Sequence, residues 1–228
     1  MVLGQALHVA VLEPELFKQD YLLLPEVKDR RASAYKEAVK THDADLTLIG
    51  HEANYIAGMQ ESMSNNQTVS ARLKAAGRSE VSVITTDPET GVAVRCRFDR
   101  LSDLNEATDL KKTQDARAPA FSRSVANYTY HVQQAFYSDV WEWETGEKLK
   151  DFLFCAVEEK LPHAAMLYQL DDEAVEYGRK LYREALNYYA ECLNKDIWPA
   201  YSEEVEMLSL PTWAAPDVED NFTFDEDQ

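Results

Sequence analysis

The feature that most constrains the fold of this chain is a change of hydrophobic period near residue 79. Two runs rich in β-branched residues, SEVSVITT and VAVRCRFD, stand on either side of the five-residue segment DPETG. Such runs around a short connection that contains Pro and Gly predict an antiparallel hairpin. Because the two strands of a hairpin pair about their turn, we expect Glu80 opposite residue 98 or 99. The core is therefore expected to form around a sheet that contains this hairpin.

The rest of the chain predicts helices and further strands around the hairpin. Apolar residues at helical spacing predict helices over 2–12, 50–64, 67–76, 121–143 and 172–194. ATDLK at 107–111 and the apolar run DFLFCAVE at 151–158 predict two strands, and MLYQL is a candidate neighbour of the second. Residues 18–47 have weak periodicity and receive no assignment. We expect an α/β (α+β) domain in which helices flank a central mixed, largely antiparallel β-sheet.

Length and composition indicate one folded domain in the cytoplasm. The chain has 228 residues, which favours a single domain, placed here at 1–215, before a tail at 216–228. The last twelve residues hold six acids and no base, so this tail is expected to be acidic and mobile. No apolar run reaches the roughly 18–20 residues that a membrane span needs, and the first residues lack the basic start of a signal peptide.

Charge argues against a generally basic nucleic-acid-binding protein, and cysteine content argues against a protein held together by disulfides or zinc. The net charge is −18, whereas a protein that binds nucleic acid usually has a basic surface, so DNA could bind only at a local basic groove or with a metal ion. Cys96, Cys155 and Cys192 are far apart and form no C-x-x-C pair. They are interpreted as small buried apolar residues rather than as disulfides or zinc ligands.

The short strand ATDLK carries the first candidate for chemistry. Side chains alternate along a strand, so Asp109 and Lys111 share one face and Lys112 lies on the other. Taken alone, this D-x-K pattern is more often an ordinary ion pair. However, Asp99 ends the hairpin strand just before it, and Glu80 is expected beside Asp99. These carboxylates would repel each other unless a hard divalent cation, Mg²⁺ or Mn²⁺, lay among them. A metal-bound water there could hydrolyse a phosphodiester, with Lys111 orienting or deprotonating that water.

Two helical pairs supply further candidates. His8 follows Gly4 by four residues, so the two share a face of the first helix, although a lone histidine there could equally belong to the core. Gln133 and Tyr137 are also four residues apart and lie beside an apolar stripe. An amide and a phenol in that place can hold a ligand or a carboxylate, or form an ordinary pair on the helix surface.

In this order, these residues resemble the PD-(D/E)xK nuclease superfamily, in particular its RecE-like branch (exodeoxyribonuclease VIII type) of phages and prophages. The resemblance covers most of the chain. The matching segments are LGQALHVAVLEPELF at 3–17, RSEVSV at 78–83, RCRFDRL at 95–101, DLKKTQDARAPAFSRSVANYTYHVQQAFY at 109–137 and LPTWA at 210–214. The sequence departs from the usual pattern in having DLKKT for DLKTT and in lacking a segment before the first helix.

The resemblance implies a restriction-endonuclease-like core and specific roles for the residues. His8, Glu80, Asp99 and Asp109 would surround a metal ion, Mg²⁺ or its substitute Mn²⁺, and Lys111 would be the catalytic lysine. Residues expected to bind substrate or to support the site are Gln133, Tyr137, Arg97 and Arg123. The implied activity is an exonuclease that degrades linear double-stranded DNA from its 5′ ends and leaves 3′ single strands for recombination. The implied partners are DNA ends, further copies of the chain in a ring, and a single-strand annealing recombinase, with no membrane, in a phage or its bacterial host.

Two other functions remain open at the level of sequence. One is a non-catalytic protein that binds DNA ends or serves as a scaffold. The other is a different DNA nuclease of the same superfamily, such as an endonuclease, which would also cut covalently closed circles.

Overall fold

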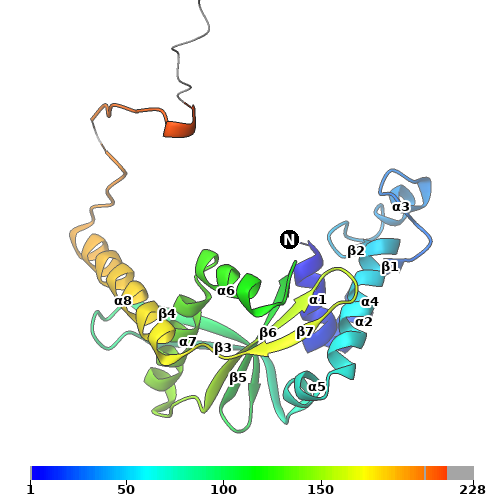
Figure 1. Cartoon of the computed structure of the whole chain (residues 1–228), viewed down its shortest axis with the longest axis horizontal. Coiled ribbons are helices and arrows are strands. Elements are labelled where there is room, and N and C mark those ends of the chain that lie inside the picture. Colours follow the sequence, from blue (N-terminus) through cyan, green and yellow to red (C-terminus); the bar gives the residue numbers. More distant parts are fainter. Residues whose placement is uncertain (1, 203, 215–228) are drawn as a thin grey trace, which may run out of the picture. The chain divides into compact units, whose positions relative to one another are not determined.

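A computed structural model describes residues 2–202 and 204–214 of the chain (Figure 1). The chain forms two compact units, one from residue 1 to 190 and the other from residue 191 onward. The acidic tail expected at 216–228 lies outside the described residues, so its mobility stays a prediction, as does the extent of a single domain over 1–215.

A five-stranded mixed sheet forms the centre of the first unit. Its strands are β3 (Gly77–Thr86), β4 (Ala93–Ser102), β5 (Glu106–Thr113), β6 (Asp151–Glu158) and β7 (Ala165–Tyr168), and they lie side by side in that order. β5 and β6 pair in parallel, and the other neighbours are antiparallel. The predicted hairpin, the two further strands and the largely antiparallel sheet are therefore confirmed.

Helices cover both faces of this sheet and divide the interior into two cores. One face packs against α1 (Val2–Leu12), α4 (Gly50–Asn65) and α5 (Gln67–Lys74), and its core includes Leu110 and Cys155. The other face packs against α6 (Ala118–Asn127) and α7 (Tyr130–Thr145), and its core includes Phe98 and Phe154. The two groups of helices can be followed in Figure 1. β5 and β6 are thus buried on both faces, as parallel pairs usually are.

The segment at 18–47, which the sequence left unassigned, forms a small elaboration. It contains the end of α2 (Pro14–Asp20), then β1 (Leu22–Leu24), α3 (Ser33–Ala38) and the start of β2 (Thr47–Ile49). β1 and β2 form a separate parallel pair. Three buried residues make its core, namely Val27, Tyr35 and Ile49. Because this core is so small, the apolar residues of 18–47 show no clear helical or strand periodicity, and the sequence predicts no element there.

The single helix predicted over 121–143 is wrong, because the chain forms two helices there. α6 ends at Asn127, and α7 begins at Tyr130. Between them Thr129 has a φ of 55°, a left-handed conformation that no α-helix can contain. The apolar stripe continues across this break, since Val125 and Val140 are buried in the same core. Periodicity alone therefore could not show the break.

The remaining helices are α8 (Asp172–Lys195) and a short 3₁₀ helix at Thr212–Ala214. α8 begins where Asp171 Oδ1 accepts a hydrogen bond of 2.8 Å from the Ala174 N–H, the usual way in which an aspartate caps the start of a helix. Within the described ranges, no helix is long and apolar enough to cross a membrane. The three cysteines are free and buried, which confirms their interpretation as apolar residues.

Candidate active site

The candidate site lies where β4 and β5 separate. These strands pair only at Arg100↔Thr108 and Leu101↔Ala107. One step further along, the Leu110 N–H donates a 2.7 Å hydrogen bond to Asp99 Oδ2 instead of to a strand carbonyl. The Asp99 carboxylate therefore satisfies a backbone donor that the divergence of the strands would leave unpaired. This places a carboxylate in the gap between the two strands.

Glu80 lies on β3 directly across from Asp99. The ladder pairs Ser79 with Arg100 and Val81 with Phe98, so the predicted register of Glu80 is confirmed, with Asp99 as the opposite residue. Glu80 interrupts this ladder with a φ of 52°. A left-handed residue other than Gly costs on the order of 1–3 kcal/mol, and such residues are enriched at active sites. The backbone distortion thus coincides with the candidate site.

His8, Glu80 and Asp99 form a group that could bind a metal ion. One possible ligand atom from each residue lies within 4.8 Å of the other two. Helix α1 packs across β4 and β5 and brings His8 Nδ1 to 3.4 Å from Asp99 Oδ2. Burial lowers the pKa of His8, although the charge of Asp109 opposes this shift. A neutral imidazole results at neutral pH, which is the form that binds metals.

The electrostatics of the group fit a divalent cation. Burial, with the nearby charge of Asp109, raises the pKa of Asp99 well above its usual range. Burial also raises the pKa of Glu80, although Arg97 opposes this shift with a contact of 2.9 Å to Glu80 Oε2. Both carboxylates are therefore costly to ionise unless a cation lies close to them. Two carboxylates and an imidazole suit a hard or borderline divalent ion, so the residues present fit the metal that this fold class implies.

Asp109, Lys111 and Gln133 form a second group beside the first. Lys111 Nζ lies 2.5 Å from Asp109 Oδ2 and donates a 3.0 Å hydrogen bond to Gln133 Oε1. The Gln133 Nε2 donates to Asp109 Oδ1, so one amide bridges the acid and the lysine. Asp109 does not belong to the three-residue group. Its Oδ2 is buried and, within the described structure, has only the ion pair with Lys111 and no well-directed hydrogen bond.

The two lysines of DLKKT lie on opposite faces of β5, as the alternation of side chains along a strand predicts. Lys111 points to the face of α7, where its Nζ lies 4.5 Å from the centre of the Tyr130 ring and 5.9 Å from that of Phe154. Lys112 instead pairs with Glu159. Sequence reasoning missed Tyr130. The available signal was its spacing, because Tyr130, Gln133 and Tyr137 are at i, i+3 and i+7 and share one face of α7.

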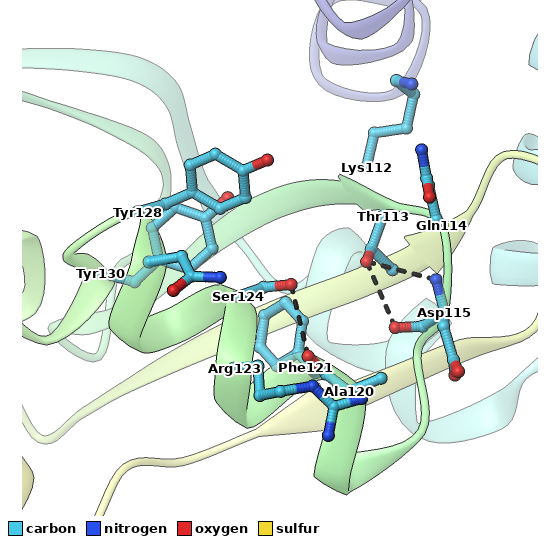
Figure 2. Close-up of a pocket in the computed structure, with 11 residues that line it drawn as sticks. Lys112, Thr113, Gln114, Asp115, Ala120, Phe121, Arg123, Ser124, Tyr128 and Tyr130 are labelled. Carbon is cyan, nitrogen blue, oxygen red and sulfur yellow. Dashed lines mark hydrogen bonds between the residues drawn. The ribbon is translucent and has the colours of Figure 1, made fainter. Parts of the chain in front are cut away.

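The other predicted residues lie around this centre. Tyr137 packs edge-on against Phe98, with ring centres 5.4 Å apart. Arg97 contacts Glu80 and is 66% exposed. Arg123 lies apart from the metal-ligand group, where it lines a pocket between the end of β5 and α6 (Figure 2). The roles assigned to all these residues stay predictions.

The mixed sheet, its diverging central strands and the acid–lysine pair define the PD-(D/E)xK nuclease fold class. More particularly, the chain belongs to the family described as "PDDEXK-like domain of unknown function (DUF3799)", which matches residues 1–211. The superfamily and the fold expected from the sequence are therefore confirmed.

A solved structure of low sequence identity shares this fold. A crystal structure from Eubacterium rectale, described as a "putative exonuclease", aligns with a TM-score of 0.56 at 14% identity and covers 78% of this chain and 70% of its own. A second structure, of SSO0001, has 15% identity and covers 85% of this chain and 94% of its own, but its TM-score of 0.31 supports no argument. No curated protein sequence matches the chain.

Proposed function

We propose that this protein is a metal-dependent deoxyribonuclease that hydrolyses phosphodiester bonds at the ends of linear double-stranded DNA. The observation that carries the proposal is the position of Lys111, which the Asp109 carboxylate and the Gln133 amide hold beside the group of His8, Glu80 and Asp99. A fold shared with a protein described as a "putative exonuclease", and membership of a family described as PDDEXK-like, agree with this activity.

Each residue has a separate task in this proposal. His8, Glu80 and Asp99 would hold the divalent ion, Mg²⁺ or Mn²⁺, with Asp109 as a further candidate ligand. Such an ion supplies a water of lowered pKa and stabilises negative charge on a phosphate. The Lys111 ammonium has three N–H donors, of which Asp109 and Gln133 engage two, so the third is left to donate to a phosphate oxygen or to the attacking water and to orient it. Gln133 keeps that ammonium directed into the site, because its amide oxygen accepts from Lys111 Nζ.

A basic strip next to the site offers a path for DNA on an acidic protein. Arg95 and Arg97 precede Asp99 at two-residue intervals along β4, opposite Ile84 and Ser82 of β3. Both arginines are exposed, and Arg97 contacts Glu80 of the metal-ligand group. Strand alternation places them on one face of the hairpin. Their charges can neutralise successive phosphates, which locally reverses the effect of the net charge of −18.

The test is digestion of a linear duplex labelled at either its 5′ or its 3′ ends, with Mg²⁺ or Mn²⁺ and with EDTA. We expect mononucleotides or short products only with metal, and a loss of at least about 100-fold in Lys111→Ala. Lys148→Ala is the matched control, since Lys148 is exposed and pairs with Glu142 at 3.9 Å. Binding of DNA ends without any product, whether or not metal is present, would instead support the scaffold function.

A closed circular substrate distinguishes an exonuclease from an endonuclease, and the two end labels give the direction of digestion. A covalently closed circle should stay intact if the protein is an exonuclease and should be cut if it is an endonuclease of the same superfamily. Early release of the 5′ label rather than the 3′ label would support the 5′-to-3′ direction that the RecE-like motifs imply. Retained 3′ single strands would fit a role in recombination with a single-strand annealing partner.

A further inference from the structure

A pocket of about 480 Å³ opens next to the candidate site and has no part in the metal chemistry described above. It lies between the end of β5, helix α6 and the start of α7, as Figure 2 shows. Its volume falls within the roughly 300–1,000 Å³ that is usual for small-ligand sites. Its floor includes Phe121, which is 2% exposed and belongs to the core. The pocket is therefore built on a rigid part of the fold.

A stack of aromatic rings runs from the core to the rim of this pocket. Phe154 is fully buried, and the Tyr130 ring stacks on it with centres 5.7 Å apart and planes at 23°. The Tyr128 ring stacks on Tyr130, again with centres at 5.7 Å and planes at 24°. The left-handed Thr129 lies between the two tyrosines, at the break between α6 and α7. Tyr128 ends the stack and is 67% exposed, which leaves it accessible to another flat ring.

The polar lining suits a nucleotide rather than an apolar ligand. Arg123 and Lys112 supply two cations, and the Lys112 ammonium already contacts Glu159. The one carboxylate in the lining, Asp115, is bound by Arg117 through hydrogen bonds of 3.0 Å and 2.6 Å. Neutral side chains complete the lining, namely Thr113, Gln114, Ser124 and Asn127. A phosphate and the edge of a base would both find partners here.

One aromatic ring, that of Tyr130, connects the pocket with the proposed catalytic lysine. The Tyr130 ring, which lines the pocket, is the same ring that lies 4.5 Å from Lys111 Nζ. A nucleotide stacked on Tyr128 would thus be close to a phosphate held at Lys111, as neighbouring positions of one DNA strand are. Bases inside a duplex have both faces covered, so the Tyr128 ring can stack only on a base at a strand end, and a base that has left its partner can enter the pocket more deeply than a paired one.

We propose that this pocket binds the unpaired terminal nucleotide of a DNA strand, with its base stacked on Tyr128 and its phosphate held by Arg123 and Lys112. The inference rests on the proposed function in that the ligand is DNA. It adds a site that separates the last base from its partner and sets the distance from the strand end to the phosphate that is cut.

The test measures binding in EDTA, so that it does not depend on cleavage. The probe is a linear duplex with 2-aminopurine, a fluorescent base quenched by stacking, as one unpaired nucleotide at the 5′ end, at the 3′ end or in the interior of a strand. We expect wild-type protein to quench the probe at one strand end and to leave the interior probe unchanged. Tyr128→Ala should lose this quenching and raise the Kd about tenfold, whereas Tyr128→Phe, which keeps the ring, should behave as wild type.

Two more variants complete the design. Tyr177→Ala is the matched control, because Tyr177 is a tyrosine on α8 with a similar exposure of 58%. Arg123→Gln should weaken binding of the end-labelled duplex and keep the quenching at saturation, since its role is to hold the phosphate. Circular dichroism of each variant verifies that the fold is intact.

Failure of this inference can be told apart from failure of the proposed function. If Tyr128→Ala quenched the probe as strongly as wild type, or if terminal and interior probes were quenched equally, the pocket would not be the site of the terminal nucleotide. This conclusion would hold even if the protein digested DNA with Mg²⁺. Quenching that depends on Tyr128 would support the pocket even in a protein that releases no products with any metal.

Discussion

At the scale of single residues, Gln133 is the side chain that connects the acid and the lysine of the candidate site. Its amide donates to Asp109 and accepts from Lys111, so it fixes the position of both groups. Replacing it by the similarly sized Leu removes both hydrogen bonds. We expect Gln133→Leu to lower the rate of DNA hydrolysis about 10- to 100-fold in single-turnover assays, with the Kd for DNA in EDTA unchanged. A rate equal to that of wild type would show that Lys111 needs no such support.

Asp99 is the residue for which function and stability should oppose each other. Burial and the charge of Asp109 raise its pKa, so the ionised carboxylate destabilises the metal-free protein. In Asp99→Asn the amide oxygen can still accept from the Leu110 N–H, while the charge is gone. We expect the metal-free variant to melt at or above the Tm of wild type at pH 7–8, and to lose hydrolysis.

The same variant tests whether Asp99 binds a metal ion. For wild type, Mn²⁺ at about 100 times its Kd should raise the Tm by on the order of 5 °C, because an ion that binds only the folded state stabilises it. Asp99→Asn should show little of this increase. An equal increase in both proteins, measured by differential scanning fluorimetry, would exclude Asp99 as a ligand.

At the scale of elements, an ion pair joins the tip of the β3–β4 hairpin to α8. Asp87, at the start of the turn, is fully buried and receives hydrogen bonds of 2.9 Å and 2.8 Å from Arg183 Nη1. Burial alone would raise the pKa of Asp87, but hydrogen bonds from Thr90 and Arg183 outweigh it and hold that pKa below its usual value of 3.8. The carboxylate therefore stabilises the folded state.

We expect Asp87→Asn to lower the free energy of unfolding by about 2 kcal/mol at pH 7. Because the folded pKa lies below the unfolded one, this difference should be complete above pH 3.8 and should shrink as the pH falls through the folded pKa. Glu89→Gln is the control, since Glu89 is 65% exposed and lies 3.6 Å from Arg183; its effect should stay within about 0.5 kcal/mol. Urea unfolding at pH 3 and pH 7 measures both. A difference that grows toward low pH would contradict the ion pair.

The elements that sequence predicted correctly are those whose own pattern determines them. Alternation and the DPETG turn were sufficient for the hairpin and for the position of Glu80 opposite Asp99. The break at Thr129 depends on one left-handed residue, which leaves the apolar stripe intact, and so it was missed. The position of Tyr128 at a pocket rim was hidden for the same reason, because a continuous helix would have placed Tyr128 on the buried stripe.

At the scale of the whole molecule, the charge is strongly uneven. Six of the acids are in the last twelve residues, whereas Arg95 and Arg97 lie in a row beside the candidate site. An acidic exterior around a basic path would keep DNA at the site and away from other surfaces. The RecE-like motifs imply that such a path is formed in a ring of several copies, which we propose for this protein too.

The second unit offers the surface that such an assembly would bury. Its side chains Tyr201, Val205 and Met207 are almost completely exposed, at 108%, 101% and 98%. Apolar side chains in this state gain about 25 cal/mol for each Å² that a neighbouring copy covers. We therefore expect light scattering to give a mass that is a multiple of 26.0 kDa, and Tyr201→Ser with Met207→Ser to shift it toward the single chain. Leu161→Ser, at an exposed apolar position of the first unit, should leave the mass unchanged. A wild-type mass of 26.0 kDa at micromolar concentration would refute the assembly, and digestion by that single chain would show that the site is complete without it.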